Sequence, residues 1–222
     1  MPKENTPVIK EIWIEALQDP HRRYKIIWGS VGVAILLSFM PMFFNHIEKR
    51  NGVVLNDWVL ARVPAYDMSY PIFAIIWGMA ILMVVRALRN PNIFIKYIWT
   101  LIFINLARFT SISLIVLDPP RGLIHLVDPI SGIFYGNASI TKDLFFSGHT
   151  STVVLMFLCL ERPKDKIIGF LAIVFVMILL LIQHIHYTID VIAAPVIVYL
   201  LFTVTCYFLK LGTPRKIAEN RL

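Results

Sequence analysis

The stretch IIGFLAIVFVMILLLIQ (residues 167–183), followed after three residues by YTIDVIAAPVIVYLLFTVTCYFL (187–209), decides the fold class. Each stretch has the roughly 17–25 predominantly apolar residues that a helix needs to cross a bilayer. Further apolar stretches occur at about 26–44, 70–88, 97–117 and 146–160, the last of them short. The sequence therefore predicts an all-α integral membrane protein, folded as a bundle of six transmembrane helices.

The composition agrees with a membrane protein and argues against other classes. The 222-residue chain is 58% hydrophobic and 16% charged, and its mean hydropathy is +0.72. A soluble domain of this length would need more polar surface. The net charge of +7 does not indicate a nucleic-acid partner, because the basic residues lie between the apolar stretches. Cys159 and Cys206 lie inside apolar stretches, so no disulfide framework is expected.

The lysine and arginine residues predict the orientation of the bundle. With a cytoplasmic N-terminus, fifteen of the 21 basic residues fall on the cytoplasmic side, five on the opposite side, and Arg108 within the third span. Basic residues concentrate in cytoplasmic loops, so we expect both termini in the cytoplasm. We expect no cleavable signal peptide, because the first apolar stretch begins only near Ile26. A bacterial inner membrane suits this compact chain better than a Golgi or plasma membrane.

Three segments follow from this topology. Residues 1–25 contain apolar side chains at helical spacing, followed by the basic pair Arg22-Arg23. This pattern predicts an amphipathic helix, either lying on the cytoplasmic leaflet or packed against the bundle. Residues 26–209 form the six-span membrane domain, and residues 210–222 form a basic cytoplasmic tail.

Two short polar strings stand at the margins of apolar stretches, Ser147-Gly148-His149-Thr150 and His186-Tyr187-Thr188-Ile189-Asp190. Ionisable residues in such positions are costly to keep in a membrane and indicate a functional site. The predicted topology places both strings on the exoplasmic face. Thirty-seven residues separate His149 from His186, about one helical hairpin down and back, so the two strings are able to face each other.

His186 and Asp190 are four residues apart and share one face if the sixth span is helical there. A carboxylate beside an imidazole fixes its tautomer and leaves the other nitrogen able to attack or to abstract a proton. The alternative is a structural hydrogen bond between the two side chains that stabilises a helix end. His184, two residues earlier, is expected to support the site and not to act as a second nucleophile.

His149 follows Ser147 and Gly148 at a predicted helix N-terminus. Backbone N–H groups bind anions there, and glycine allows a phosphate to approach closely. A histidine in the first turn can donate a proton to a leaving oxygen. The alternative is a helix-capping serine beside an interfacial histidine.

Arg108 is the basic residue within the third span, and a buried arginine requires a partner. Its planar fork suits two oxygens of a phosphate, and the alternative partner is a carboxylate such as Asp143 or Asp118. No His-Glu-x-x-His pattern occurs, and the outer carboxylates are scattered, so we expect neither a metal nor another cofactor.

Taken together, these stretches resemble the sphingomyelin synthase family, a branch of the type 2 phosphatidic acid phosphatase superfamily. The string Asp143-Leu-Phe-Phe-Ser147-Gly148-His149-Thr150 is similar to its D-x-x-x-S-G-H-T motif, and residues 186–191 are similar to its H-Y-T-x-D-V motif. The third-span arginine with Pro120 is similar to a further motif, and residues 55–64 loosely match a fourth. The resemblance covers roughly residues 50–195.

The resemblance implies transfer of a phosphoalcohol, phosphocholine or phosphoethanolamine, from a glycerophospholipid to ceramide or a similar lipid alcohol such as diacylglycerol. It implies that His149, His186 and Asp190 are catalytic, that Arg108, Ser147 and Gly148 bind the phosphate, and that Asp143, Tyr187 and His184 support them. The family's Cys-Gly before the aspartate is Thr141-Lys142 here, which leaves the head group open.

Two other functions stay open at this point. Water entering the same site would make the protein a lipid phosphatase or a phospholipase C-like hydrolase. That hydrolytic branch carries a Ser-Arg pair shortly before its second histidine, where this chain has Leu179-Leu180, so the synthase-like branch is favoured. The other function is a catalytically silent membrane binder or channel with a structural His–Asp cluster, although too few polar residues line the spans to support a pore. A homo-oligomer is compatible with the sequence.

Overall fold

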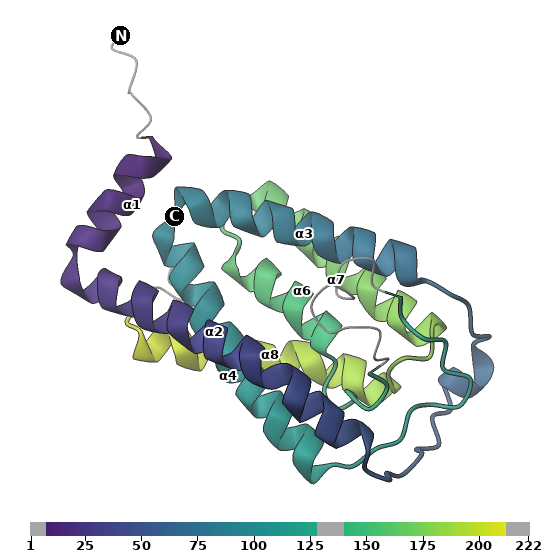
Figure 1. Cartoon of the computed structure of the whole chain (residues 1–222). Helices are drawn as coiled ribbons and strands as arrows, with labels where there is room; N and C mark the ends of the chain where they lie inside the picture. Colours follow the sequence, from purple (N-terminus) through teal and green to yellow (C-terminus); the bar gives the residue numbers. More distant parts are fainter. Residues whose placement is uncertain (1–7, 128–139, 212–222) are drawn as a thin grey trace.

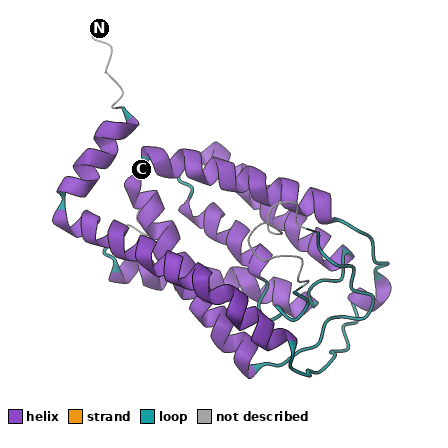
Figure 2. Cartoon of the chain, viewed as in Figure 1, coloured by secondary structure: helices purple, strands orange, loops and turns teal. Residues whose placement is uncertain are grey.

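The computed structural model describes residues 8–127 and 140–211 of the chain (Figure 1). Within these residues every regular element is a helix (Figure 2). The elements are α1 (Ile9–Gln18), α2 (Pro20–Glu48), the 3₁₀ helix η1 (Leu60–Arg62), α3 (Ser69–Arg89), α4 (Pro91–Leu114), α6 (Gly148–Cys159), α7 (Pro163–Ile182) and α8 (Thr188–Phe208). The prediction of an all-α protein is confirmed for this part of the chain.

Five of these helices, α2, α3, α4, α7 and α8, are long and apolar enough to cross a membrane. The helix of the predicted fourth span, α6, has only 12 residues, Gly148–Cys159. At 1.5 Å per residue α6 is about 18 Å long, against roughly 30 Å for a bilayer core. Helices thus form at all six predicted spans, while the six crossings and the cytoplasmic termini stay predictions.

The short helix α6 lies at the centre of the bundle. It packs against α3, α4, α7 and α8, and Figure 1 shows it between α3 and α8. Eight of its twelve residues are buried, among them Val153 and Leu155, which are fully inaccessible. A helix covered on every side by other helices does not need a polar face, which explains why its sequence is apolar all round.

The N-terminal helices begin where capping residues place them. Asp19 caps α2 by accepting a hydrogen bond from the His21 N–H (2.9 Å), and Pro20 occupies the first helical position. The helix therefore begins six residues before the apolar stretch, and the predicted boundary at residues 25–26 falls inside it. Helix α1 packs on the bundle: the Trp13 indole donates to the Leu88 carbonyl (2.9 Å), and Ala16 is fully buried.

Ion pairs hold one end of the bundle together. The Arg86 guanidinium on α3 binds both oxygens of Asp165 on α7, at 2.6 and 3.0 Å. Lys96 on α4, which is 5% exposed, pairs with Glu161 in the α6–α7 turn at 3.4 Å. A charge at this depth is tolerated only with an opposite charge beside it, and the sequence prediction places this end on the cytoplasmic side.

The loops at the opposite end are bound to one another and to the α7–α8 turn. Val53 and Leu117 form an isolated parallel bridge, with Val53 N–H donating to the Val116 carbonyl and Asp118 N–H to the Val53 carbonyl, both at 3.1 Å. Gly52 lies so close to Leu117 that a Cβ there would be 2.5 Å from the Leu117 carbonyl carbon. The two outer loops therefore form one layer over this end. The predicted tail, residues 210–222, lies outside the described residues except for Lys210 and Leu211.

Candidate active site

The two polar strings lie together at one end of the bundle. His149 occupies the first turn of α6, and His186 lies just before α8, which begins at Thr188. The two imidazole ring centroids are 6.1 Å apart, with the ring planes inclined at 63°. Phe73 on α3 stands edge-on to the other side of His149, also at 6.1 Å between centroids. The separation of the histidines allows one small group to contact both rings.

Asp190 lies beside His186 and is fully buried. Its Oδ2 is 3.6 Å from His186 Nδ1, slightly beyond hydrogen-bond distance, and it accepts a hydrogen bond from the Tyr187 N–H at 3.0 Å. Neither His186 Nδ1 nor Asp190 Oδ1 has a hydrogen-bond partner among the described residues. Buried polar atoms without partners are uncommon. Catalytic hydrogen bonds are often long before substrate binds, so a shift of a few tenths of an ångström would join this pair.

A backbone hydrogen bond joins the two strings directly. The Ser147 N–H donates to the Asp190 carbonyl at 3.1 Å, so the residue before α6 is bound to the first turn of α8. Ser147 also caps α6, because its Oγ accepts a hydrogen bond from the Thr150 N–H at 3.3 Å. These bonds fix the position of His149 relative to His186. They give Ser147 a structural role besides the phosphate contact that the resemblance implies.

Arg108 reaches the site from α4 and is 5% exposed. Its guanidinium donates to the Phe146 carbonyl from Nε (3.1 Å), to the Asn105 side chain from Nη1 (3.3 Å) and to Asp143 from Nη2. The carboxylate alternative of the sequence reading is therefore present, with Asp143 as the partner. The remaining N–H bonds of the fork make no further contact with the described residues, so a phosphate oxygen can meet them.

Gly148 is the residue that allows Arg108 to lie against the start of α6. A Cβ on Gly148 would be 2.6 Å from Nη2, 2.7 Å from Cζ and 2.9 Å from Nη1 of Arg108. The guanidinium thus rests on the glycine itself, next to the N-terminus of the helix. The Gly148 N–H makes no hydrogen bond to the described residues. Helix N-terminal N–H groups and a guanidinium together make an anion site.

The supporting residues Tyr187 and His184 bind the outer loops. The Tyr187 hydroxyl donates to the Asp118 carbonyl (2.8 Å) and accepts from the Leu55 N–H (3.1 Å). His184, at φ 56°, places Nδ1 3.1 Å from the Arg121 carbonyl and Nε2 2.9 Å from the Val63 carbonyl. The two contacts of the His184 ring do not involve His149 or His186. His184 therefore fixes the outer loops to the turn that carries His186.

Asp57 is a residue whose role sequence reasoning missed. Its carboxylate accepts hydrogen bonds from the Thr188 N–H (2.6 Å) and hydroxyl (3.0 Å), and so caps α8 from another loop. Partial burial acts to raise the pKa of Asp57, but the hydrogen bonds from Thr188, Leu60 and Val59 outweigh it and hold the pKa below its ordinary value of 3.8. Sequence reasoning also missed Gln183, whose side-chain amide binds the Met68 N–H, the Ser69 hydroxyl and the His125 carbonyl. Its position as a polar residue at the end of an apolar span could have indicated this role.

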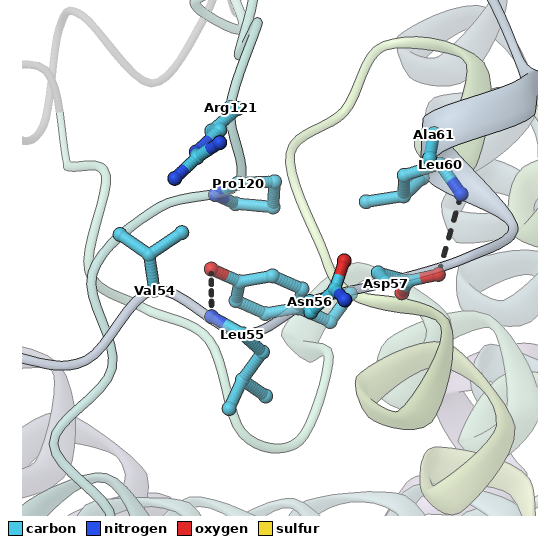
Figure 3. Close-up of a pocket in the computed structure, with 9 residues that line it drawn as sticks. Val54, Leu55, Asn56, Asp57, Leu60, Ala61, Pro120 and Arg121 are labelled. Carbon is cyan, nitrogen blue, oxygen red and sulfur yellow. Dashed lines mark hydrogen bonds between the residues drawn. The ribbon is translucent and has the colours of Figure 1, made fainter.

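A pocket of about 500 Å³ opens beside Tyr187 in the outer loop layer (Figure 3). Its walls come from residues 54–57 and 60–61 on one loop and residues 120–121 on the other. His149 and His186 do not line it, but Tyr187 follows His186 in the chain. The described residues contain no cluster of three or more His, Cys, Asp or Glu side chains placed to hold a metal ion.

Comparison with known proteins finds a match in the segment that carries these residues. No curated protein sequence matches the chain. One protein family does, described as PAP2 superfamily C-terminal, over residues 142–207. That segment runs from the residue before Asp143 to the end of α8 and contains His149, His186 and Asp190. The segment that contributes both histidines is therefore similar to the type 2 phosphatidic acid phosphatase superfamily, whose members carry out phosphatase or phosphotransferase chemistry on lipids.

Proposed function

We propose that the protein transfers the phosphorylated head group of a glycerophospholipid to a lipid alcohol, with ceramide as the first acceptor to test. The observation that carries this proposal is the pair of histidines, partly exposed His149 and buried His186, 6.1 Å apart between ring centroids, with Asp190 beside His186. The Arg108 guanidinium over Gly148 supports the phosphate part of the proposal. Phosphocholine and phosphoethanolamine are the head groups that the sequence resemblance implies.

In the first step His186 acts as the nucleophile. Asp190 accepts the Nδ1–H of His186 and leaves the Nε2 lone pair directed at phosphorus. A nitrogen–phosphorus bond forms as the bond from phosphorus to the diacylglycerol oxygen breaks. His149 in its protonated form donates its proton to that oxygen. The products are diacylglycerol and a phosphohistidine that carries the head group.

In the second step His149, now neutral, removes the proton from the primary hydroxyl of the acceptor. The hydroxyl oxygen attacks phosphorus, and the nitrogen–phosphorus bond to His186 breaks. His149 is protonated again and His186 is restored, so the cycle closes without any other reagent. Arg108 and the Gly148 N–H neutralise charge on the non-bridging phosphate oxygens in both steps.

The experiment that tests this function is a product analysis with purified protein. Vesicles containing phosphatidylcholine or phosphatidylethanolamine with labelled head groups are incubated with and without ceramide. Transfer predicts a labelled sphingolipid that forms only when ceramide is present. Release of a water-soluble phosphorylated head group in both cases would instead identify a hydrolase, and the absence of any product would overturn both activities.

Three substitutions assign the roles. His186→Ala and His149→Ala should each abolish turnover, because one removes the nucleophile and the other the proton donor. Arg108→Lys should lower turnover by about 10²-fold, since a point charge replaces the planar fork. Near-normal turnover of His186→Ala would contradict the covalent step, even if transfer itself is observed.

A further inference from the structure

The pocket beside Tyr187 has the location and size of a site for a small polar group. Its volume is about 500 Å³, and its lining includes Leu55, Asn56, Asp57, Pro120, Arg121 and Tyr187. Figure 3 shows Arg121 with Pro120 on one part of the wall and Asn56 with Asp57 on another. The wall therefore combines aliphatic side chains with one cation, one carboxylate and one amide.

The pocket is fixed to the segment that carries His186. Both of its walls are bound to the α7–α8 turn: Tyr187 bonds the Leu55 N–H and the Asp118 carbonyl, and His184 bonds the Arg121 carbonyl. In the proposed function, a phosphate is held at the histidine pair, at the end of the bundle that carries the outer loops, so the head group on it would extend toward those loops. The pocket lies in that loop layer, one residue along the chain from His186.

Asp57, the carboxylate of the pocket, already accepts four hydrogen bonds from the protein. Its Oδ1 accepts from the Val59 N–H (3.0 Å), the Leu60 N–H (3.2 Å) and the Thr188 hydroxyl (3.0 Å), and its Oδ2 accepts from the Thr188 N–H (2.6 Å). Each carboxylate oxygen offers about two lone-pair positions, so a single position on Oδ2 stays open. An ammonium group entering the pocket would find that one acceptor, but the positive charge of Arg121 in the same lining opposes it.

The Arg121 side chain, unlike that of Asp57, forms no hydrogen bond or ion pair with the described residues. Its guanidinium carries N–H donors only. The Asn56 amide adds a donor and an acceptor to the same pocket. The pocket thus offers donors to hydroxyl oxygens. A quaternary ammonium is usually held by several aromatic faces, and Tyr187 is the single aromatic side chain of this lining.

We infer that this pocket is the specificity site for the head-group alcohol of the lipid donor, and that it selects an uncharged, hydroxyl-rich alcohol such as glycerol or inositol over choline and ethanolamine. Arg121 is the residue that determines this specificity, by donating hydrogen bonds to the hydroxyl oxygens. The inference rests on the proposed function and narrows its donor. It departs from the two head groups that the sequence resemblance implies.

A donor competition tests the inference. Vesicles with equal amounts of phosphatidylglycerol, phosphatidylinositol, phosphatidylethanolamine and phosphatidylcholine, together with ceramide, are incubated with the protein, and the products are identified by mass. We expect the products from the glycerol and inositol donors to exceed the other two by about tenfold. Arg121→Gln should remove this preference by slowing those two reactions and leaving the others unchanged.

Arg62→Gln is the matched control, because phosphatidylglycerol and phosphatidylinositol are anionic lipids that any surface arginine attracts. Arg62 is in the same loop layer but outside the pocket lining, with its guanidinium bound to the Trp58 carbonyl (2.7 Å). It should keep the full preference. Equal loss of preference in both variants would mean that surface arginines attract the anionic lipids generally, and it would overturn the pocket assignment. A preference for the choline or ethanolamine donor would overturn it as well.

A binding measurement separates failure of the inference from failure of the proposed function. Short-chain phosphatidylglycerol and phosphatidylcholine are titrated into His186→Ala protein and into the His186→Ala, Arg121→Gln double variant. Tighter binding of the glycerol lipid, lost in the double variant, upholds the pocket even if no transfer occurs with any donor. Equal binding of the two lipids overturns the inference, whatever the transfer assay gives.

Discussion

At the scale of single residues, the site depends on how closely Arg108 approaches Gly148. The guanidinium is held by Phe146, Asn105 and Asp143 and lies against the glycine at the start of α6. That the arginine, the glycine and the two histidines belong to one site could be predicted from the sequence. Asp143 was one of two carboxylates that the sequence offered as alternative partners of Arg108, and the choice between them depends on how α4 is rotated against the loop before α6, which the sequence does not give.

Gly148→Ala should reduce turnover by about 10²-fold while the protein stays folded. The new Cβ would be 2.6–2.9 Å from three guanidinium atoms, so Arg108 must move away from the phosphate position. Initial rates and the unfolding midpoint in detergent measure the two effects. Gly78→Ala is the control, because a Cβ on Gly78 in α3 meets nothing within 4 Å. Equal rates for both variants would contradict the assigned role of Gly148.

Asp190→Asn should separate catalysis from stability. The amide oxygen of asparagine can still accept the Tyr187 N–H bond that Asp190 accepts at 3.0 Å, so the start of α8 keeps its cap. The negative charge that orients His186 is lost, and turnover should fall by about 10⁴-fold. Transfer assays and thermal unfolding of the same preparation check this. If transfer activity and the unfolding temperature fell together, Asp190 would have only a structural role.

At the scale of elements, the helix ends position the chemistry, and Asp57 caps α8 from a distant loop. Most helix positions could be predicted from apolar stretches, and the helices end within about six residues of the predicted limits. Helix α2 begins at Pro20, six residues before the apolar stretch at about 26–44, because Asp19 and Pro20 begin the helix in a polar segment. The outer loop layer could not be predicted, because its bonds join residues that are distant in the chain, such as Thr188 and Asp57, which are 131 positions apart.

Asp57→Asn should destabilise the protein at neutral pH by about 1 kcal/mol, the usual contribution of a helix cap. The pKa of Asp57 is below its ordinary value of 3.8, so its stabilising effect is present above about pH 4 and is lost as the pH falls through the folded-state pKa. The difference in unfolding midpoint between wild type and variant should therefore shrink from pH 7 to pH 3. Glu15→Gln, an exposed carboxylate of α1, should show no such difference.

At the scale of the whole molecule, the candidate active site lies at one end of the bundle, and two ion pairs join the helices at the other end. The Arg86–Asp165 and Lys96–Glu161 pairs lie at one end, and the histidines and the outer loops at the other. The sequence prediction assigns the end with the ion pairs to the cytoplasm from the distribution of lysine and arginine. A direct measurement of sidedness is required to test that assignment.

Single cysteines placed at the two ends should differ in labelling of intact cells. Asn51→Cys in an outer loop should react with a membrane-impermeant maleimide, and Lys164→Cys in the first turn of α7 should react only after the cells are permeabilised. Both positions are exposed, whereas the native Cys159 and Cys206 are 1% and 0% exposed and contribute little background. The reverse pattern would place the site on the cytoplasmic face.

The hydrogen bond from the Ser147 N–H to the Asp190 carbonyl has a consequence for how the protein is made. The first histidine string is synthesised well before the second, and α8 follows last of the helices. Until α8 has entered the membrane and packed beside α6, Ser147 lacks this partner and His149 lacks the neighbouring ring. Under the proposed mechanism a nascent chain would therefore be inert toward the lipids around it, and transfer would begin only when α8 is in place.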